Sequence, residues 1–496
     1  MPDRRPYLCL VAILATYVSG YALFPAGAFT SSDESAYVEQ AVVFANGSLA
    51  SVSPYPPGTS LLQSPFVAIA GWRAAPWLSL LALGATVLLM ARWLRDAGYH
   101  PGFALLFLAY APTLVMARVG TSEVPSAAMV TLGLWLFWTG QDARWKWGLA
   151  GWLAGLSILL RETNILLFLP FLTAATASRR PGWLVLASTA AAGLATAVLG
   201  YWLTAATLPG LRVTAGFSMD AVGRNIGIYA ICMLVLAPGG LAAIATYKGR
   251  ERRALTAAVA GYLAVYLFYD YSGQDSAPIA RLAAVGRYLI PLIPLVTIAW
   301  ADWMSRLVVD APFRRAAVAA FVLTAGAAFS VHPTLRIWTA RDADIVTRIA
   351  ATARTGLVIA DDRQRRYVAP MFGQFNRHWI IDTPVGHLPA LTSRHAGTYV
   401  VNVYRSDTAL MQSLSMDARS YVKGASRICV IEPVIDRAYG EARRLQIWRL
   451  SLCGQRVAPA SFLRAVPATA LLFAPAPPDP RDTIDSPEDK TRALLP

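Results

Sequence analysis

Two neighbouring carboxylates, Asp33 and Glu34, lie just beyond the first hydrophobic segment of the chain, and the loop sequence Tyr55-Pro56-Pro57-Gly58 follows soon after them. A membrane protein has no folding reason to carry two adjacent carboxylates where a helix meets the interface, so ionisable residues there mark a candidate functional site. A carboxylate in such a place can accept a proton from a reacting group. An ordinary solvated loop is the alternative, and it would give the pair no chemical role.

The overall composition is that of an integral membrane protein. The 496 residues are 56% hydrophobic and only 15% charged, which is too apolar for a soluble protein of this length. The first apolar run, residues 7–24, follows Arg4 and Arg5. It lacks a convincing small-x-small cleavage motif and many apolar runs follow it, so we expect a retained anchor rather than a cleaved signal peptide.

About eleven apolar runs are long enough, or nearly long enough, to cross a membrane. They cover residues 7–24, 76–94, 103–117, 124–139, 147–160, 164–177, 182–206, 226–247, 254–269, 287–307 and 315–331. Several are shorter than the roughly 20 residues that a perpendicular helix needs, so the runs on either side of Arg161 form either one bent hairpin or two spans. We therefore expect a multi-pass α-helical domain over residues 1–331.

Basic residues are concentrated in every second loop. Because Lys and Arg collect on the cytoplasmic side, this alternation predicts a cytoplasmic N-terminus. The cytoplasmic loops then hold Arg4, Arg5, Arg92, Arg95, Arg144, Lys146, Arg179, Arg180, Lys248, Arg250, Arg252, Arg253, Arg306, Arg314 and Arg315. The net charge of +15 is thus largely an orientation signal and a contact with anionic lipid, and no nucleic-acid partner is expected.

A soluble domain is predicted beyond residue 331, on the outer side of the membrane. Its expected strands are residues 356–361, 397–404, 427–432 and 445–450, and its expected helices are residues 344–353 and 406–414. This pattern predicts a small α/β extracytoplasmic domain over residues 332–473. Residues 474–496 are rich in proline and charge, which predicts a disordered tail.

The four cysteines fall into two pairs. Cys9 and Cys232 lie in apolar runs, where a thiol usually acts as a small hydrophobic group. Cys429 and Cys453 lie in or beside predicted strands of the outer domain, where an oxidising compartment would allow a disulfide; two buried free thiols are the alternative. No cysteine or histidine cluster has the spacing of a zinc site, so no such site is expected.

Further ionisable residues are predicted at the outer ends of other spans. They are Arg118, Glu123, Arg161, Glu162, Asp270, Arg287 and the adjacent Tyr288. Loops contain charged residues for ordinary reasons, but Arg161 and Arg287 directly adjoin apolar runs. A guanidinium group in that position needs a partner or an anionic ligand.

Carboxylates and arginines that meet at a lipid interface suit a reaction on a lipid-linked phosphate. A sugar carried on polyprenyl phosphate has an anionic leaving group, which arginines stabilise without a general acid. The acceptor hydroxyl loses its proton as it attacks the anomeric carbon, and one carboxylate can take that proton. Direct attack would invert the anomeric centre.

Five segments, in this order, resemble those of GT-C glycosyltransferases. They are the Asp33-Glu34 pair, Tyr55-Pro56-Pro57-Gly58, Thr121-Ser122-Glu123-Val124-Pro125, Arg161-Glu162-Thr163 and Arg287-Tyr288-Leu289-Ile290-Pro291. Roughly residues 1–331 are most similar to the branch of protein O-mannosyltransferases and lipid A aminoarabinose transferases. The resemblance implies an inner (plasma) membrane enzyme that moves a sugar from a polyprenyl-phosphate donor to an extracytoplasmic glycan, lipid or protein acceptor.

The resemblance also implies roles for individual residues. Asp33 matches the catalytic base, Glu34 its neighbour and Glu123 the second acidic position of the site. Arg287 and Tyr288 match the Arg-Tyr segment, for which contact with the donor phosphate is expected.

Other substrate contacts are assigned less directly. Arg161 is a second candidate phosphate ligand, although a salt bridge with Glu162 or Asp270 would explain it equally well. Arg118 is a further candidate, and Tyr55 begins a stiff Pro-Pro loop that is expected to shape the substrate entrance. The sequence lacks an Asp-x-Asp pattern, so no metal ligand is assigned and a divalent cation is left open.

Two other classes of function stay open. A transporter or flippase of lipid-linked saccharide would more often carry ionisable residues near mid-span, and the predicted spans are nearly free of them. A membrane-anchored binding or assembly module would act through the outer domain. It would tolerate substitution at Asp33, whereas a glycosyltransferase would not.

Overall fold

The computed structural model of the chain describes residues 5–49, 51, 53, 55–140, 143–178, 182–204, 206, 217–269, 285–306, 326, 330–352, 357–360, 365–368, 379–381, 397–404, 428–439 and 444–453. The chain divides into two compact units, each with its own hydrophobic core. The first comprises residues 1–25, 51–69 and 73–333, and the second comprises residues 26–50, 70–72 and 334–496. The second unit thus includes residues 26–50, which the sequence-based boundary at 331 assigns to the transmembrane part.

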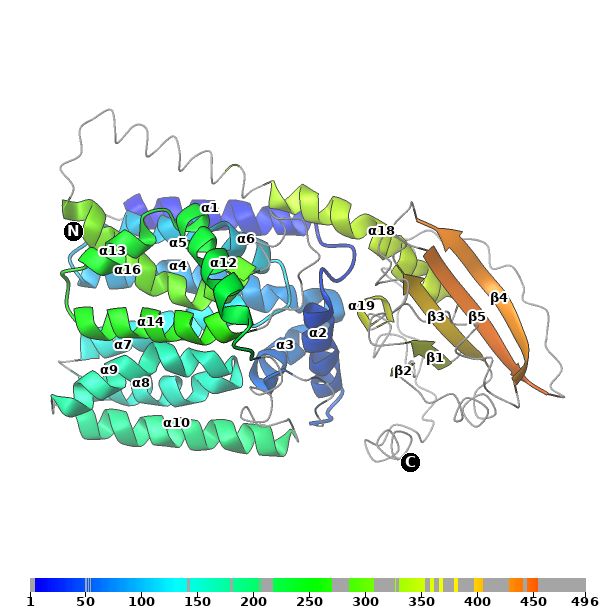
Figure 1. Cartoon of the computed structure of the whole chain (residues 1–496), viewed down its shortest axis with the longest axis horizontal. Helices are drawn as coiled ribbons and strands as arrows, with labels where there is room; N and C mark the ends of the chain where they lie inside the picture. Colours follow the sequence, from blue (N-terminus) through cyan, green and yellow to red (C-terminus); the bar gives the residue numbers. More distant parts are fainter. Residues whose placement is uncertain are drawn as a thin grey trace. The chain divides into compact units, whose positions relative to one another are not determined.

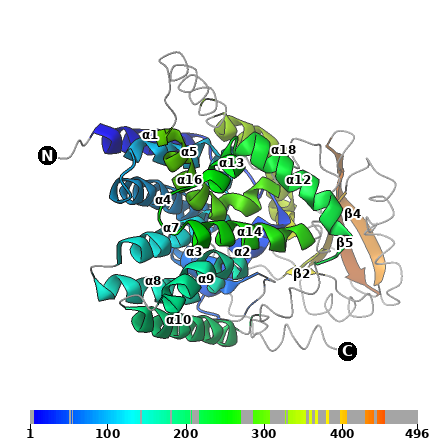
Figure 2. The same ribbon diagram turned by 60° about the vertical axis from the view of Figure 1, so that its left-hand side comes forward.

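The first unit is a bundle of helices (Figure 1). Its longer helices are α1 (Arg5–Leu23), α3 (Pro57–Ala70), α4 (Pro76–Asp96), α7 (Glu123–Thr139), α8 (Arg144–Leu156), α9 (Ile165–Ala177), α10 (Trp183–Leu203), α12 (Ala221–Leu236), α14 (Arg252–Phe268) and α16 (Ile293–Arg306). Helices α7, α8, α9, α10 and α14 run side by side in both views (Figures 1 and 2). Such a bundle of apolar helices is the architecture expected of a membrane domain.

Four helical segments in the described part of the chain are long and apolar enough to cross a membrane. They are Arg5–Leu23, Trp72–Asp96, Trp183–Leu203 and Arg287–Arg306, and the bent pair α12 and α13 makes a fifth if it counts as one span. The expected count of about eleven is not confirmed. The apolar runs in α7, α8 and α9 form helices of only 17, 13 and 13 residues, and most of residues 315–331 lie outside the described part.

Proline and glycine mark the places where apolar runs break. The run over residues 103–117 divides into η2 (Pro101–Ala104), α5 (Leu105–Ala109) and α6 (Ala111–Met116), and Pro112 occupies the first turn of α6, where its missing N–H costs nothing. Between α12 and α13 (Gly240–Thr246) the axis turns by 92°. Gly239 sits at this bend with φ of +75°, a conformation that glycine adopts without steric cost.

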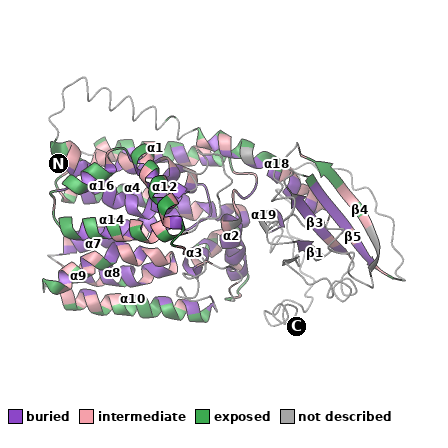
Figure 3. Cartoon of the chain, in the orientation of Figure 1, coloured by how far each residue is buried: buried purple, intermediate pink, exposed green. Residues whose placement is uncertain are grey.

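Small residues bring α8 and α10 close together. A Cβ atom on Gly151 or Gly155 of α8 would overlap the backbone of α10, and one on Gly193 would overlap the Trp152 carbonyl. Glycine allows such close helix contact within a membrane. Helix α10 is only 17% buried, against 83% for Arg287–Arg306, so α10 is peripheral and the latter segment is central (Figure 3).

The second unit contains a five-stranded mixed sheet. The strand order is β2 (Trp379–Ile381), β1 (Leu357–Ala360), β3 (Thr398–Tyr404), β5 (Arg444–Leu452) and β4 (Ile428–Ala438). Strand β1 pairs in parallel with β2 and β3, whereas β5 pairs antiparallel with β3 and β4. The four expected strands are present; the helix expected at 406–414 and the tail at 474–496 lie outside the described residues.

Three helices accompany the sheet in this unit: α2 (Ser32–Ala45), α18 (Val331–Thr352) and the short α19 (Arg365–Val368). Ile345 and Ile349 of α18 are fully buried against strand residues that include Val401 and Ile447. Helix α2 packs against α19. The sheet core therefore depends on a helix that continues directly from the first unit.

Two of the four cysteines are free thiols, and a third forms a disulfide. Cys9 and Cys232 are free thiols, and Cys453 is disulfide-bonded. The pairing of β4 with β5 aligns Ile428 with Leu452, each of which directly precedes a cysteine. The side chain of Cys429 lies outside the described residues, so its bond with Cys453 stays a prediction.

Candidate active site

Three segments that are distant in sequence meet at one end of the first unit. Glu123 is the first residue of α7, Arg161 precedes η5 (Glu162–Asn164), and Arg287 opens η6 (Arg287–Leu292). The Asn164 amide fixes the turn after Arg161, because its Nδ2 donates to Ser126 Oγ of α7 at 3.1 Å. The start of a helix carries partial positive charge, so this end of the bundle favours anionic groups.

One carboxylate oxygen faces both arginines. Arg161 Nη1 lies 3.4 Å and Arg287 Nε 3.7 Å from Glu123 Oε1. All three side chains are nearly buried, at 5% exposure for Glu123, 12% for Arg161 and 8% for Arg287. Glu123 Oε2 is buried without a hydrogen-bond partner among the described residues. This trio, Glu123, Arg161 and Arg287, therefore brings two guanidinium groups to one carboxylate oxygen.

Tyrosines hold the two guanidinium groups. Arg161 Nε donates to the Tyr266 hydroxyl at 3.0 Å, and Thr163 Oγ1 lies 3.1 Å from the same oxygen. Arg287 Nη2 donates to the Tyr288 hydroxyl at 3.0 Å. The two rings are stacked with centroids 5.4 Å apart, and the Arg161 guanidinium carbon lies 5.1 Å from the Tyr288 ring centroid. Hydrogen bonds and cation–π contacts thus restrict both arginines.

The Pro-Pro loop lies beside the turn that carries Arg161. Gly58, the second residue of α3, lies so close to the Leu159 carbonyl that a Cβ atom would overlap it. Leu159 ends η4 (Ser157–Leu159), two residues before Arg161. Tyr55 lies in the preceding loop, where its backbone N–H donates to Ser53 Oγ at 3.2 Å. The loop therefore supports the Arg161 turn, and Tyr55 stays a candidate for substrate contact.

Arg118 has a different environment. It is fully buried, and its Nη1 donates to the carbonyls of Val331 at 3.2 Å and His332 at 2.8 Å, while its Nη2 donates to the carbonyl of Phe24. Its guanidinium carbon lies 5.4 Å from the ring centroid of Tyr21. Backbone carbonyls at the end of α1 and the start of α18 thus engage two of its nitrogens, whereas its buried Nε has no hydrogen-bond partner among the described residues. Its contact with substrate stays a prediction.

The carboxylate pair belongs to the second unit, in the first turn of α2. Ser31 Oγ accepts the Glu34 N–H at 3.1 Å, and Glu34 Oε2 accepts the N–H and hydroxyl of Thr30 at 2.7 and 2.9 Å. This is a capping box, in which the side chain three residues into the helix bonds back to the residues before it. Glu34 is buried, whereas Asp33 is partly buried. The Glu34 carboxylate therefore shapes the helix start.

The structure brings two of the predicted site residues, Arg161 and Arg287, into contact with a third, Glu123. Asp33 and this trio belong to different units, so their cooperation is a proposal. Glu162 accepts a hydrogen bond from the Tyr201 hydroxyl at 3.3 Å, and Asp270 lies outside the described residues. Sequence reasoning missed Tyr266, although its position four residues after Tyr262 on an apolar helix places two tyrosines on one face.

Comparison of sequences finds no match, whereas comparison of structures finds a similar fold. No protein-family model and no curated protein matches the sequence. The crystal structure of ArnT from Cupriavidus metallidurans bound to undecaprenyl phosphate matches with a TM-score of 0.59 at 14% identity, covering 90% of this chain and 98% of that chain. The apo crystal structure of that ArnT matches with a TM-score of 0.57 at 16% identity, covering 89% and 97%.

This likeness concerns the fold. ArnT is a lipid A aminoarabinose transferase of the GT-C type, so the resemblance predicted from the sequence motifs is confirmed at the level of the fold. The match extends over nearly the whole chain, further than the residues 1–331 that carry the motifs. The second unit is therefore part of the shared architecture.

Proposed function

We propose that the chain is a glycosyltransferase that takes a sugar from a polyprenyl-phosphate donor and passes it, with inversion, to an acceptor on the outer side of the inner membrane. The observation that carries the proposal is the convergence of Arg161 and Arg287 on one oxygen of Glu123. The ArnT-like fold supports it.

The charges of the trio suit a phosphate. Guanidinium groups make charge-assisted, often bidentate bonds to phosphate oxygens, and two of them meet here. Glu123 and the two tyrosines hold the arginines before the ligand arrives, so little side-chain entropy is lost on binding. In the ArnT structure the bound molecule is undecaprenyl phosphate.

Asp33 supplies the base in this proposal. The acceptor oxygen forms a bond to the anomeric carbon while the bond from that carbon to the phosphate oxygen breaks. The acceptor's proton passes to the Asp33 carboxylate, and the departing phosphate keeps the electron pair beside Arg161 and Arg287. Glu34 is engaged in the capping box, so it is the less suitable base of the two.

The placement of the charges favours an enzyme over a flippase. A transporter is expected to carry its ionisable site near mid-span, but the trio lies where α7 and η6 begin. A binding module remains the alternative that Asp33 variants test.

Purified protein in phosphatidylcholine nanodiscs, supplied with a panel of polyprenyl-phosphate sugars, tests the proposal. We expect release of polyprenyl phosphate together with transfer of the sugar to an acceptor or, more slowly, to water. Turnover of nucleotide sugars alone would contradict the proposal. So would movement of intact donor across a vesicle bilayer without cleavage, because that result identifies a flippase.

A further inference from the structure

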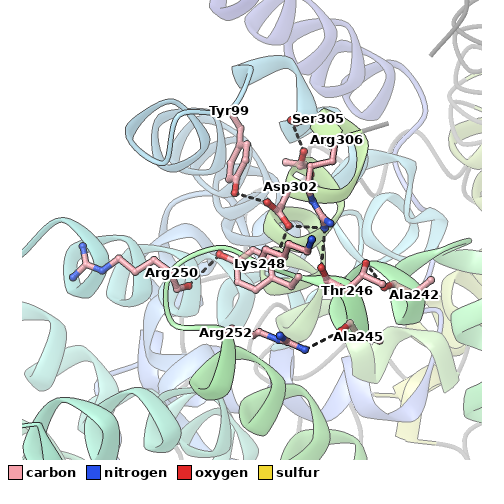
Figure 4. A network of polar contacts seen from close by, with 12 residues as sticks. Tyr99, Ala242, Ala245, Thr246, Lys248, Arg250, Arg252, Asp302, Ser305 and Arg306 are labelled. Atoms are coloured by element: carbon pink, nitrogen blue, oxygen red, sulfur yellow. Dashed lines mark hydrogen bonds and ion pairs between the residues drawn. The ribbon is translucent and has the colours of Figure 1, made fainter. Parts of the chain in front are cut away.

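A second charged cluster lies at the other end of the segment that Arg287 opens. Arg287–Arg306 contains 20 residues, which at 1.5 Å per residue span about 30 Å, the thickness of a bilayer's hydrocarbon core. Arg306 Nη2 donates to the carbonyl of Thr246 at 2.8 Å, so the turn from α13 to α14 lies at this far end (Figure 4). When this segment crosses the membrane, the cluster and the trio lie at opposite faces.

A buried carboxylate fixes the turn between α13 and α14. Asp302 is 7% exposed, and it accepts hydrogen bonds from Arg306 Nη2 at 2.8 Å, the Tyr99 hydroxyl at 3.1 Å and the backbone N–H of Lys248 at 3.1 Å. These contacts join the ends of α4 and α16 to the turn (Figure 4). The basic side chains that follow are therefore presented from a fixed backbone.

Three cations of this turn are not neutralised. Arg306 pairs with Asp302, and Arg250 pairs with Glu251 at 3.4 Å. Lys248, Arg252 and Arg253 are exposed, and within the described part of the chain no carboxylate lies within ion-pair distance of them. Arg252 Nη2 reaches only the Ala245 carbonyl, at 3.5 Å. The turn thus presents three positive charges within six residues.

The direction of helix α13 indicates that these cations lie at the membrane interface. Because its axis turns by 92° from α12, it runs along the membrane plane when α12 crosses the membrane. The nitrogen of Trp300 holds the bend by donating to the Pro238 carbonyl at 3.1 Å. Leu241, in the first turn of α13, is 42% exposed, and the basic turn follows the end of this seven-residue helix. Apolar residues beside cations allow a short helix to contact acyl chains and headgroups together.

We propose that Lys248, Arg252 and Arg253 bind the headgroup of an anionic phospholipid in the leaflet opposite to the candidate active site. The headgroup's negative charge offsets the three cations, and its acyl chains pack beside Leu241. A zwitterionic lipid is a poorer ligand because its own ammonium group opposes the attraction. This inference does not depend on the proposed glycosyltransferase activity.

Native mass spectrometry of the full chain, released from nanodiscs of phosphatidylcholine with and without phosphatidylglycerol, tests this site. Arg252→Gln/Arg253→Gln is compared with Arg144→Gln/Lys146→Gln, which removes the same charge from the start of α8, a turn that the sequence predicts on the same face. We expect the wild type and the α8 variant to retain phosphatidylglycerol preferentially, and the α14 variant to lose affinity on the order of tenfold or more.

Several outcomes would overturn the site. Equal losses in both double variants would show diffuse charge attraction, and no loss in either would remove the site. If inorganic phosphate stabilises the detergent-solubilised protein as much as phosphatidylglycerol does, the ligand is a free anion. Thermal melting in phosphatidylcholine alone verifies folding, and Lys248→Gln replaces the α14 variant if that variant does not fold.

Discussion

Glu123 Oε1 lies 3.4 Å from Arg161 Nη1, and this contact ties the first residue of α7 to the turn before α9. Arg287 shares the same oxygen. The carboxylate is therefore the counter-charge for two nearly buried cations, and its removal has consequences for both stability and ligand binding.

Glu123→Gln should lower the thermal stability of the ligand-free protein, because two buried guanidinium groups lose their shared counter-charge. Breaking a buried pair commonly costs about 3 to 5 kcal/mol. Undecaprenyl phosphate should raise the melting temperature of this variant more than that of the wild type, since the phosphate replaces the lost charge. Glu162→Gln is the matched control. If undecaprenyl phosphate raises the melting temperature of the variant and the wild type equally, Glu123 does not belong to the phosphate site.

Arg287→Ala should raise the donor KM while the protein stays folded. The lost charge-assisted contact contributes about 1.5 to 3 kcal/mol, roughly tenfold to a hundredfold in affinity. Arg287→Lys should recover part of the affinity, because it keeps the charge but not the planar fork. The exposed Arg336 of α18 provides the control variant, Arg336→Ala. Unchanged donor affinity in folded Arg287→Ala protein would exclude this residue from the site.

Gly58→Ala should disturb the Arg161 turn, since the new methyl group would overlap the Leu159 carbonyl. Overpacking of this kind typically costs about 1 to 3 kcal/mol. Gly84→Ala in α4 is a matched control with open space around the added Cβ, and alanine favours the helix there by roughly 0.5 to 1 kcal/mol. Melting temperatures and donor KM values measure both effects. A Gly58→Ala protein as stable and active as the wild type would contradict the close approach.

A disulfide between Cys429 and Cys453 should be present in exported protein. Closing this loop would stabilise the second unit by about 3 kcal/mol. Peptide mass spectrometry under non-reducing conditions detects the bond directly. Two alkylatable thiols at these positions would refute it.

The residues of the trio could be predicted because an ionisable residue beside an apolar run costs free energy in a membrane protein and usually has a function. That reasoning selected Glu123, Arg161 and Arg287 without any knowledge of their distances. The same reasoning predicts Arg118, whose two terminal nitrogens bond to backbone carbonyls rather than to a carboxylate. Composition cannot separate these two outcomes, because both place an arginine at the end of an apolar run.

Other features depend on tertiary structure. The apolar runs are visible in the sequence, but their lengths as helices are set by interruptions such as Pro112 and Gly239. The assignment of α2 to the second unit follows from its packing against α19, which no local pattern reveals. The capping contacts of Glu34 are predictable in principle, since Ser31 and Glu34 have the spacing of a capping box.

Sugar transfer by Asp33→Asn is the most direct test of the proposed reaction. The amide keeps the shape of the side chain but cannot accept the acceptor's proton. We expect turnover to fall by a factor of about 100 to 10,000, while melting temperature and binding of the polyprenyl-phosphate sugar stay unchanged. Glu34→Gln should retain turnover and most of the stability, because glutamine also serves as the third residue of a capping box. Near wild-type turnover by Asp33→Asn would contradict the proposal that Asp33 is the base.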